Sequence, residues 1–248
     1  MSHRFQSFMT SLESTYSAIS TLPSCNPSTE IQFIEEQLRT SEGAIKLSDA
    51  SPESIFDAVT FAAKLNITLA PHLGFARLKA VKARDGAVEC ALDLSLPGML
   101  DAFSRVDGME VYRLMIATMD SPISWHGDVM KSEVEMPEKV SRNSEPTGVV
   151  CVIKLKSGDL LPTTLKMSEV NELARLSGVA PDAITPEFAK RHALKRALKT
   201  LVAPTGSQLS ALQQVVRRVD MSLFCSHVEN HEELAEQTQA EKYFQQQD

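Results

Sequence analysis

Aromatic residues are scarce in this chain of 248 residues: they make up 6% of it, with one tryptophan and three tyrosines. No apolar run approaches the length of about 18 residues that a membrane-spanning helix requires. The first five residues, MSHRF, contain no apolar core of a signal peptide. We therefore expect a soluble cytoplasmic protein with no membrane partner, and a hydrophobic content of 43% suffices for a full-sized core.

Catalytic and metal-binding signatures are also missing. No Gly-x4-Gly-Lys-Ser/Thr loop is present, and no lysine has an acidic residue two positions before it, so neither ATP-driven strand exchange nor a common nuclease class is supported. The four cysteines form no CxxC pair and are typical of buried or free thiols in a reducing compartment. His227 and His231 have the spacing of a metal pair, with Cys225 nearby, but lack fixed further ligands. We expect no enzyme, no metal and no cofactor.

Charge is distributed unevenly along the chain. The formal charge of −7 argues on its own against a protein that binds a phosphate backbone. However, residues 1–50 carry a net charge of −3 and residues 220–248 one of −6, whereas residues 51–219 carry 21 basic against 19 acidic residues. The middle of the chain is therefore mildly basic. The Gln/Glu-rich end is typical of a solvated or disordered tail, with an interaction segment as the alternative.

Hydrophobic periodicity and turn residues predict the elements. Residues 3–42 fit two polar helices, and Ser51 followed by a proline caps an amphipathic helix that ends near Asn66. Residues 75–96 fit a hairpin that turns at an Asp-Gly pair, which would place Lys82 opposite Glu89. Further elements are expected at 99–106 (helix), 110–119 and 125–135 (extended), 149–166 (hairpin), 168–177 and 185–202 (helices), with a polar helical pattern from 207. A Pro-Gly pair at 97–98 is expected to interrupt the chain before the first of these helices, and Ser168 to cap the second.

This order predicts an α+β fold, in which a small antiparallel core of β-hairpins or sheet is packed with helices and flanked by helices at both ends. We expect a helical N-terminal region at 1–50 that offers oligomer contacts, an α+β core at 51–204, and a helical, acidic C-terminal region at 205–248. The core is the part whose charge is compatible with a polyanionic partner.

The most informative segment is a basic helix. Its ten residues 190–199 contain five lysines and arginines and no acid. At 100° per residue, Arg191, Lys195 and Lys199 form one row with Arg196 beside it, and leucines and alanines form the opposite, packed stripe. Such a helix suits a row of phosphates. Anionic lipid and a cationic surface without function are the alternatives, although the apolar stripe lacks the bulky aromatics of interfacial helices.

The basic helix resembles the C-terminal signature of the RecT/Redβ superfamily of single-strand annealing proteins, found in phages and mobile elements. In the RecT branch this signature is Met-Ala-Lys-Lys-Thr-Ala-Ile-Arg-Arg-Leu-Phe-Lys, closing with Leu-Pro. Here Ala189, Lys190 and Ala193 are identical to it, Lys199 matches its last lysine, and Pro204 follows the helix.

Other motifs follow in the family's order over residues 55–204. The hairpin of 75–96 corresponds to the family's first hairpin, and residues 98–102 (Gly-Met-Leu-Asp-Ala) resemble its Gly-Met-Ile-Asp-Leu helix. Where the family has Gly-Tyr-basic-Gly, this chain has Ser-Leu-Pro-Gly at 95–98. The chain therefore resembles the RecT branch as a divergent member, because it departs from the family pattern at these positions.

The resemblance implies ATP-independent annealing of complementary DNA strands during homologous recombination in a bacterial host cell. Annealing needs no covalent chemistry, because the protein neutralises phosphates and leaves the bases free to pair. The candidate contacts are Arg191, Lys195, Arg196, Lys199 and Lys190 on the helix, Arg77, Lys79 and Lys82 on the first hairpin, Lys154, Lys156 and Lys166 on the second hairpin, and Phe75 as a base-stacking ring. Each cation has the alternative of an ordinary solvated charge, and Phe75 that of a core residue.

The resemblance also implies partners. They are single-stranded DNA, the annealed duplex intermediate, and further copies of the chain in a ring or helical filament. The C-terminal region, residues 220–248, is the candidate contact for a phage-type exonuclease or the host single-strand binding protein. A rival function from another class is a non-enzymatic regulatory or architectural module whose basic helix docks duplex DNA or a protein partner.

Overall fold

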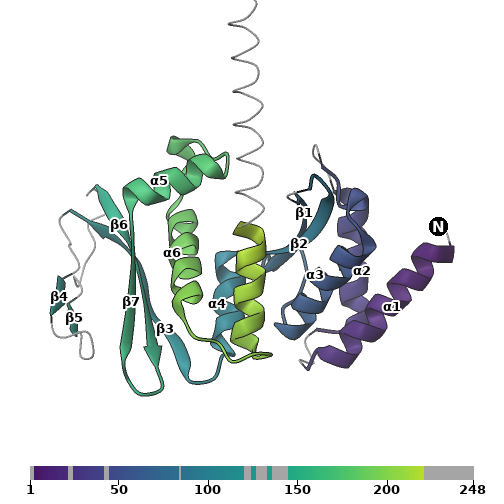
Figure 1. Ribbon diagram of the computed structural model, residues 1–248, viewed down its shortest axis with the longest axis horizontal. Coiled ribbons are helices and arrows are strands. Elements are labelled where there is room, and N and C mark those ends of the chain that lie inside the picture. Colours follow the sequence, from purple (N-terminus) through teal and green to yellow (C-terminus); the bar gives the residue numbers. More distant parts are fainter. Residues whose placement is uncertain are drawn as a thin grey trace, which may run out of the picture.

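The computed structural model describes residues 3–21, 25–41, 45–83, 85–119, 124–126, 133–135 and 145–220. Two helices begin the fold, α1 (His3–Ile19) and α2 (Pro27–Thr40), as the sequence predicts (Figure 1). Asn26 caps α2, because its side-chain oxygen accepts a hydrogen bond from a backbone N–H of the first turn at 3.1 Å. Although their sequences are polar, both helices bury apolar side chains in the main core, such as Leu12 and Ile34.

The third helix, α3 (Pro52–Lys64), begins at the predicted cap. Ser51 Oγ accepts a hydrogen bond from the backbone N–H of Ser54 at 3.2 Å. The helix is followed by Asn66 in the left-handed region, with φ of 51°. The side-chain oxygen of Asn66 accepts a hydrogen bond from the backbone N–H of Thr21 at 2.8 Å, which ties the end of α3 to the chain after α1.

The first hairpin consists of β1 (Ala76–Lys82) and β2 (Val88–Leu94). The two strands are joined up to Ala83 and Ala87, because the backbone N–H of Ala83 donates to the carbonyl of Ala87 at 2.8 Å. The residues between these two form a turn that is longer than the predicted Asp-Gly pair. Gly86 then closes the turn with φ of 81°, a conformation that favours glycine.

This turn shifts the register by one residue from the prediction. Glu89 lies opposite Val81, and Lys82 lies opposite Val88. A shift of one residue moves a side chain to the other face of its strand, so the expected pair between Lys82 and Glu89 is wrong. Glu89 instead accepts a hydrogen bond from Arg218 at 3.0 Å.

The fourth helix, α4 (Leu96–Ser104), begins earlier than predicted and includes the Pro-Gly pair that was expected to interrupt the chain. Ser95 caps it: its Oγ accepts a hydrogen bond from the backbone N–H of Gly98 at 3.1 Å and donates one to the carbonyl of Phe75 at 3.2 Å. A Cβ on Gly98 would lie 1.9 Å from that same carbonyl oxygen. Only glycine therefore fits where α4 crosses the start of the hairpin.

A three-stranded antiparallel sheet comprises β3 (Met109–Thr118), β6 (Pro146–Leu155) and β7 (Leu160–Lys166), in the order β3–β6–β7. Strands β6 and β7 form the predicted second hairpin, while β3 joins β6 from further away in the sequence. The extended segment expected at 125–135 contains two short strands, β4 (Ser124–His126) and β5 (Glu133–Glu135), which pair with each other.

Two helices follow the sheet, α5 (Met167–Leu176) and α6 (Pro186–Thr200). The N-cap of α5 is Lys166 rather than the predicted Ser168, because β7 runs directly into the helix. Thr185 caps α6 as predicted, and its Oγ1 accepts a hydrogen bond from a backbone N–H of the first turn at 3.1 Å.

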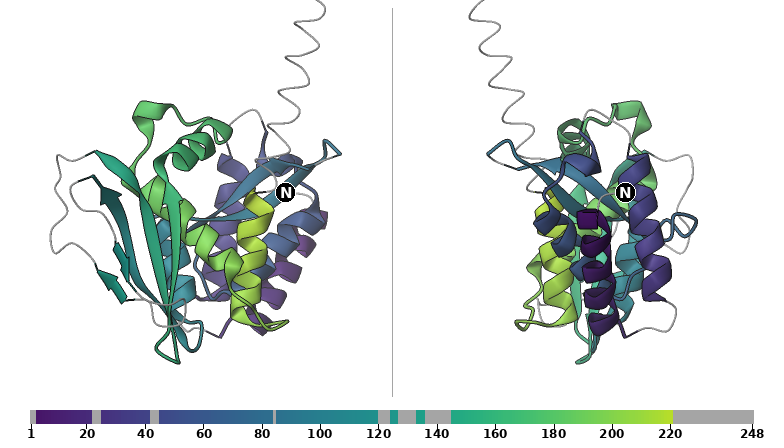
Figure 2. Two further views of the ribbon diagram at one scale, coloured as in Figure 1. Left: turned by 60° about the vertical axis from the view of Figure 1, so that its left-hand side comes forward. Right: turned by 90° about the vertical axis from the view of Figure 1, so that its right-hand side faces the viewer.

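A further helix occupies residues 208–220 and packs beside α6. Gln213 fixes this arrangement, because its Nε2 donates hydrogen bonds to the carbonyls of Leu198 and Leu201 at 2.7 Å each. Figure 2 shows the end of this helix next to the β1–β2 hairpin, where Val219 is buried with Val81 and Ala91. We call this helix, residues 208–220, the C-terminal helix. It contacts both α6 and the β1–β2 hairpin, the two elements that carry the main candidate cations.

The hairpin β1–β2 and helices α1 to α3 lie at one end of the molecule, and the sheet β3–β6–β7 lies at the other (Figure 1). Helices α4, α6 and 208–220 lie between them, and α6 covers one face of the sheet (Figure 2). One connected cluster of buried side chains extends from α1 to the 208–220 helix. The α+β fold with helical flanks is therefore confirmed, whereas the boundaries at residues 50 and 204 stay predictions.

Three of the four cysteines, Cys25, Cys90 and Cys151, are buried, as expected, and Cys225 lies outside the described residues. Burial raises the pKa of Cys90 and of Cys151 to about 12. No helix in the described part of the chain is long and apolar enough to cross a membrane.

Candidate nucleic-acid interface

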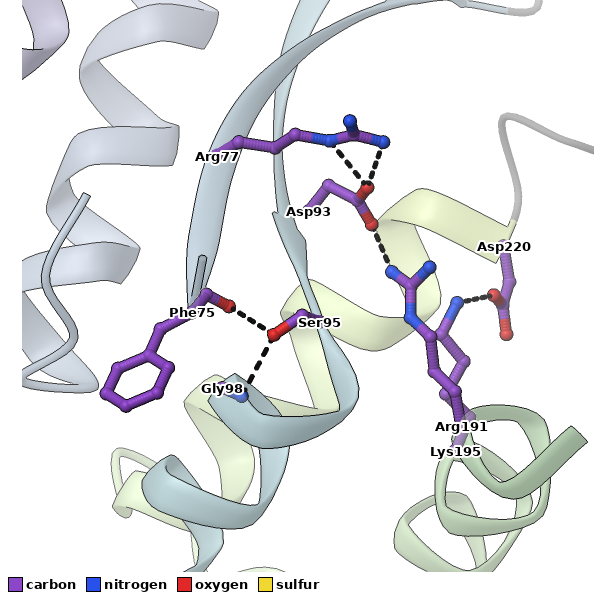
Figure 3. Close-up of polar contacts among 8 residues, drawn as sticks. All are labelled: Phe75, Arg77, Asp93, Ser95, Gly98, Arg191, Lys195 and Asp220. Carbon is purple, nitrogen blue, oxygen red and sulfur yellow. Dashed lines mark hydrogen bonds and ion pairs between the residues drawn. The ribbon is translucent and has the colours of Figure 1, made fainter. Parts of the chain in front are cut away.

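Two of the predicted cation sets meet at one carboxylate. Arg191 of α6 donates from Nη2 to Oδ1 of Asp93 on β2 (Figure 3). Arg77 of β1 donates from Nε and from Nη2 to Oδ2 of the same residue, at 3.2 Å each. Asp93 and Arg191 are 98 positions apart in the sequence. The first hairpin and the basic helix, each a predicted source of DNA contacts, therefore share one surface.

Asp93 is the buried centre of this cluster. Its side chain is 7% exposed, whereas that of Arg191 is 24% and that of Arg77 is 70% exposed. Burial favours the protonated carboxyl, but Arg191 and Arg77 outweigh it and hold the pKa of Asp93 below its usual range. Among the described residues, the buried Nε of Arg191 has no hydrogen-bond partner. The cluster thus keeps an excess of positive charge and an unused donor.

Lys195 and Lys199 form a second cluster with Asp220. Lys195 Nζ donates to Oδ1 of Asp220 at 2.8 Å (Figure 3), and Lys199 Nζ donates to Oδ2. Only 5% of the Lys195 side chain is exposed. Burial lowers the pKa of Lys195, and Asp220 opposes this effect. Burial also favours protonation of Asp220, but Lys195 and Lys199 together hold its pKa below the usual range.

The expectation that the cationic row of α6 faces solvent is wrong for Lys195. The helix 208–220 covers that side of α6 and places Asp220 against it. His192, beside the row, is also buried, and its ring lies 4.4 Å from the ring of Phe188. A helical wheel describes one helix and does not show which neighbour packs on it. Lys195 therefore reaches a phosphate only if Asp220 moves.

Arg196 and Lys190 lie outside these two clusters. Arg196 Nη2 lies 2.8 Å from Oε1 of Glu169, and its Nη1 donates to the carbonyl of Thr164 at 3.2 Å. The hydrogen bond from Arg196 lowers the pKa of Glu169. Both partners are well exposed, so this pair contributes little to stability and Arg196 stays accessible. Lys190 is half-buried on the same helix.

The three candidate cations of the first hairpin are divided between its faces. Lys79 lies two residues after Arg77, on the same face of β1. Both residues also line a groove of about 610 Å³ along this strand. Lys82 is exposed but belongs to the opposite face, which carries the buried residues Ala76 and Leu78. The structure therefore brings Lys79, and not Lys82, to the face of Arg77.

The cations of the second hairpin belong to the three-stranded sheet. Lys154 pairs with Glu110 at 3.4 Å, and Lys156 and Lys166 are exposed at the two ends of the hairpin. The sequence interpretation missed Tyr112, whose side chain is a well exposed ring. Arg113 Cζ lies 4.6 Å and Lys154 Nζ 5.8 Å from the centre of that ring. A nucleic-acid base can stack on such a ring. The sequence feature that could have identified it is one of only three tyrosines, followed directly by a cation in an expected strand.

Phe75, the candidate stacking residue, is half-buried and packs against the main core. Its ring and those of Phe33 and His72 line a cavity of about 460 Å³. Its backbone is fixed by Ser95, whose N–H and Oγ both donate to the Phe75 carbonyl, at 3.0 and 3.2 Å. Stacking on Phe75 stays a prediction.

Among the residues that the structure describes, no three histidine, cysteine, aspartate or glutamate side chains gather to hold a metal ion. His227, His231 and the tail 221–248 lie outside those residues. No protein-family model and no curated protein matches this chain. Membership of the RecT/Redβ superfamily therefore stays a prediction from the sequence.

Proposed function

We propose that this protein binds single-stranded DNA and anneals complementary strands without ATP, working as an oligomer in the cytoplasm of a bacterial host. The observation that carries the proposal is the shared bond of Arg77 and Arg191 to Asp93. The hairpin and the basic helix were each expected to contact phosphates, and their arginines meet on one surface. In this proposal, residues 220–248 contact an exonuclease or the host single-strand binding protein.

The charge of this surface supports the proposal. The charge of Lys195, which is paired with Asp220, also stabilises the ionised carboxylate of Asp93 and so lowers its pKa. The clusters around Asp93 and Asp220 therefore interact electrostatically. Together they contain four cations and two carboxylates, on a chain whose total charge is −7. A local excess of this kind acts over short distances and is screened by salt. Binding should therefore be local and sensitive to ionic strength.

The arginines suit contacts to a DNA backbone. A guanidinium group presents five donors in a planar fork, so Arg77 and Arg191 can keep their bonds to Asp93 while other donors reach phosphate oxygens. Asp93 holds both side chains in place, which reduces the conformational entropy lost when DNA binds. A strand whose phosphates are neutralised repels its complement less, and its bases remain free to pair.

An annealing assay tests the proposal. We expect the wild-type protein to accelerate duplex formation from two complementary oligonucleotides without nucleotide, measured by fluorescence energy transfer between end labels. The double variant Arg77→Gln/Lys79→Gln removes two accessible charges and should weaken single-strand binding about tenfold. It should also make the slope of log K against log salt shallower by about 1.4. Because Arg191 remains paired with Asp93, the variant should fold.

Arg175→Gln is the control for the loss of a surface charge, since it removes one positive charge from an exposed pair on α5. It should bind and anneal like the wild type. If the folded double variant retains the wild-type annealing rate and salt slope, the assignment of this surface is wrong. Selective retention of one duplex sequence, without accelerated annealing, would instead favour the regulatory or architectural module.

A further inference from the structure

Lys195 is buried against a carboxylate from the protein's own C-terminal helix. Its Nζ lies 2.8 Å from Asp220 Oδ1, and Lys199 holds the other oxygen of the same carboxylate. A cavity of about 250 Å³ lies beside this pair, between α5 and α6. Its polar wall includes His192, Lys195, Arg196, Lys199 and Asp220.

This wall has the composition of an anion site. Lys195, Lys199 and Arg196 supply three cations with their N–H donors, and among the described residues Asp220 is the single acidic one in the wall. Carboxylate and phosphate groups both present negatively charged oxygen acceptors at similar distances from an ammonium group. Asp220 therefore makes the contacts to both lysines that phosphate oxygens would make.

We propose that this cavity is a binding site for a backbone phosphate of single-stranded DNA, and that Asp220 occupies it until a strand displaces the carboxylate. The inference rests on the proposed function and adds to it a site for the phosphate and a competitor for that site. It also explains how a lysine with a buried ammonium group takes part in binding a polyanion.

The way in which the C-terminal helix is attached suits such an exchange. Its middle is held on α6 by the two hydrogen bonds from Gln213, and Leu212 and Val216 lie in the main core. Val219 belongs to a small separate cluster with two residues of the hairpin. Among the described residues of the helix, 217–220 thus lie outside the main core and can move while the rest of the helix stays in place.

Ion pairs of Arg218 tie residues 217–220 to α3 and β2. Arg218 donates to Glu89 at 3.0 Å and to Asp57 at 3.5 Å, and both pairs are partly exposed. Partly exposed ion pairs contribute little to stability, so a segment held by them opens at a lower free energy than the core. A minor state in which Asp220 has left the lysines is therefore accessible to the folded protein.

The burial of Lys195 keeps the open state rare. An ammonium group that loses its partner while it stays buried is strongly destabilised. Arrival of another anion in the cavity therefore stabilises the state that Asp220 has left. A DNA strand supplies that anion together with neighbouring phosphates, which the arginines around Asp93 can bind.

Removal of the Asp220 charge tests this inference. Asp220→Asn should bind a single-stranded oligonucleotide at least about tenfold more tightly than the wild type, because the wild-type site is open in only a minor fraction of molecules. Asp220→Glu keeps a carboxylate at the site and should retain wild-type affinity. Glu172→Gln is the matched control, since it removes the same charge from an exposed pair on α5 and should also bind like the wild type. Fluorescence anisotropy measures the affinities of the wild type and of these three variants for the oligonucleotide.

A second measurement uses the wild-type protein and does not depend on how a variant folds. Hydrogen exchange followed by mass spectrometry should show faster exchange at residues 217–220 when the oligonucleotide is added, because these residues detach from α6. Unchanged or slower exchange there, with DNA bound, would overturn the inference, as would an Asp220→Asn affinity equal to that of the wild type.

Inorganic phosphate, added in place of the oligonucleotide, distinguishes a free phosphate ion from a DNA backbone as the anion that occupies the cavity. If phosphate alone speeds exchange at 217–220 and DNA does not, the assignment to a DNA backbone is wrong. Failure of the proposed function has a different signature, because then the wild type, Asp220→Asn and Glu172→Gln all fail to bind the oligonucleotide. These outcomes cannot be confused with one another.

Discussion

His192 is a neutral side chain within a cationic segment. Its ring is buried, and this burial together with Lys195, Arg191 and Lys199 lowers its pKa to about 4, while Asp220 acts in the opposite direction. His192 is therefore uncharged at pH 7 and does not add to the positive charge that α6 offers to a phosphate.

This burial predicts a pH dependence of stability. Between about pH 6.5 and pH 4 the unfolded chain binds a proton at His192 and the folded chain does not. The free energy of unfolding should therefore fall as the pH is lowered through this window, by up to about 3 kcal/mol from this group. Asp93 and Asp220 act at lower pH, because their folded pKa values lie below the usual one and their contribution is lost only as the carboxylates protonate.

Urea unfolding at pH 7, 6 and 5 measures this dependence. His192→Gln should flatten the profile between pH 6.5 and pH 4, whatever its stability at pH 7. His72→Gln, at an exposed position, should leave the slope unchanged. A His192→Gln profile as steep as that of the wild type would show that other groups cause the loss.

Residue-level features were predictable where they depend on near neighbours. The cap Ser51 and the start of α6 at Thr185 were correct, because a cap is defined by the few residues that follow it. The predicted cap Ser168 was wrong, because β7 runs directly into α5 and Lys166 takes that position. The burial of Lys195 was not predictable, because its partner Asp220 lies on another helix and had been counted as part of an acidic tail. The same limit applies to Asp93, whose two arginines lie on different elements.

At the scale of elements, α4 and the start of the first hairpin approach each other closely at Gly98. Gly98→Ala would place a methyl group 1.9 Å from the carbonyl oxygen of Phe75, so α4 or the start of β1 must move. We expect a loss of about 3 kcal/mol in the free energy of unfolding. Gly178→Ala is the matched control: it has φ of 67° but no atom within 4 Å of the added methyl group, and should lose only about 1 kcal/mol. Equal losses in urea titrations would contradict the steric explanation.

The elements themselves were largely predictable, and their registers less so. The Asp-Gly pair indicated the first hairpin correctly, but the pairing of Ala83 with Ala87 lengthened its turn and moved Lys82 away from Glu89. The basic helix began where expected, yet the side that faces solvent is decided by the helix at 208–220. Local pattern defines an element, whereas packing decides which of its faces is free.

At the scale of the whole molecule, the α+β class followed from the order of elements, but the arrangement that matters for DNA did not. The hairpin and α6 meet through Asp93 and Arg191, 98 positions apart, and no local pattern encodes that contact. The total charge of −7 likewise conceals the local excess of cations at this surface. In the proposed complex, a DNA strand is repelled at long range by the total charge and attracted locally by this surface, and a change in salt concentration distinguishes the two effects.

The different salt dependence of long-range repulsion and local attraction allows a test of the acidic tail. Residues 221–248 carry six acidic residues and one lysine, so their charge repels DNA over a distance set by the ionic strength. Replacing Glu229, Glu232 and Glu233 by Gln should raise the rate of association with a single-stranded oligonucleotide about threefold at 20 mM salt, where screening is weak. At 300 mM salt the screening length is only about 6 Å, and the gain should vanish. Stopped-flow fluorescence measures both rates.

Asp220→Asn provides the contrast, because its effect arises from a buried contact. Its gain in affinity should persist at 300 mM salt, since a buried pair is screened much less than exposed charges. If the triple Gln variant instead keeps its full gain at 300 mM salt, the tail competes with DNA by direct contact, as we propose for Asp220. A loss of both gains at 300 mM salt would place Asp220 among the long-range charges and contradict its role as a local competitor for phosphate.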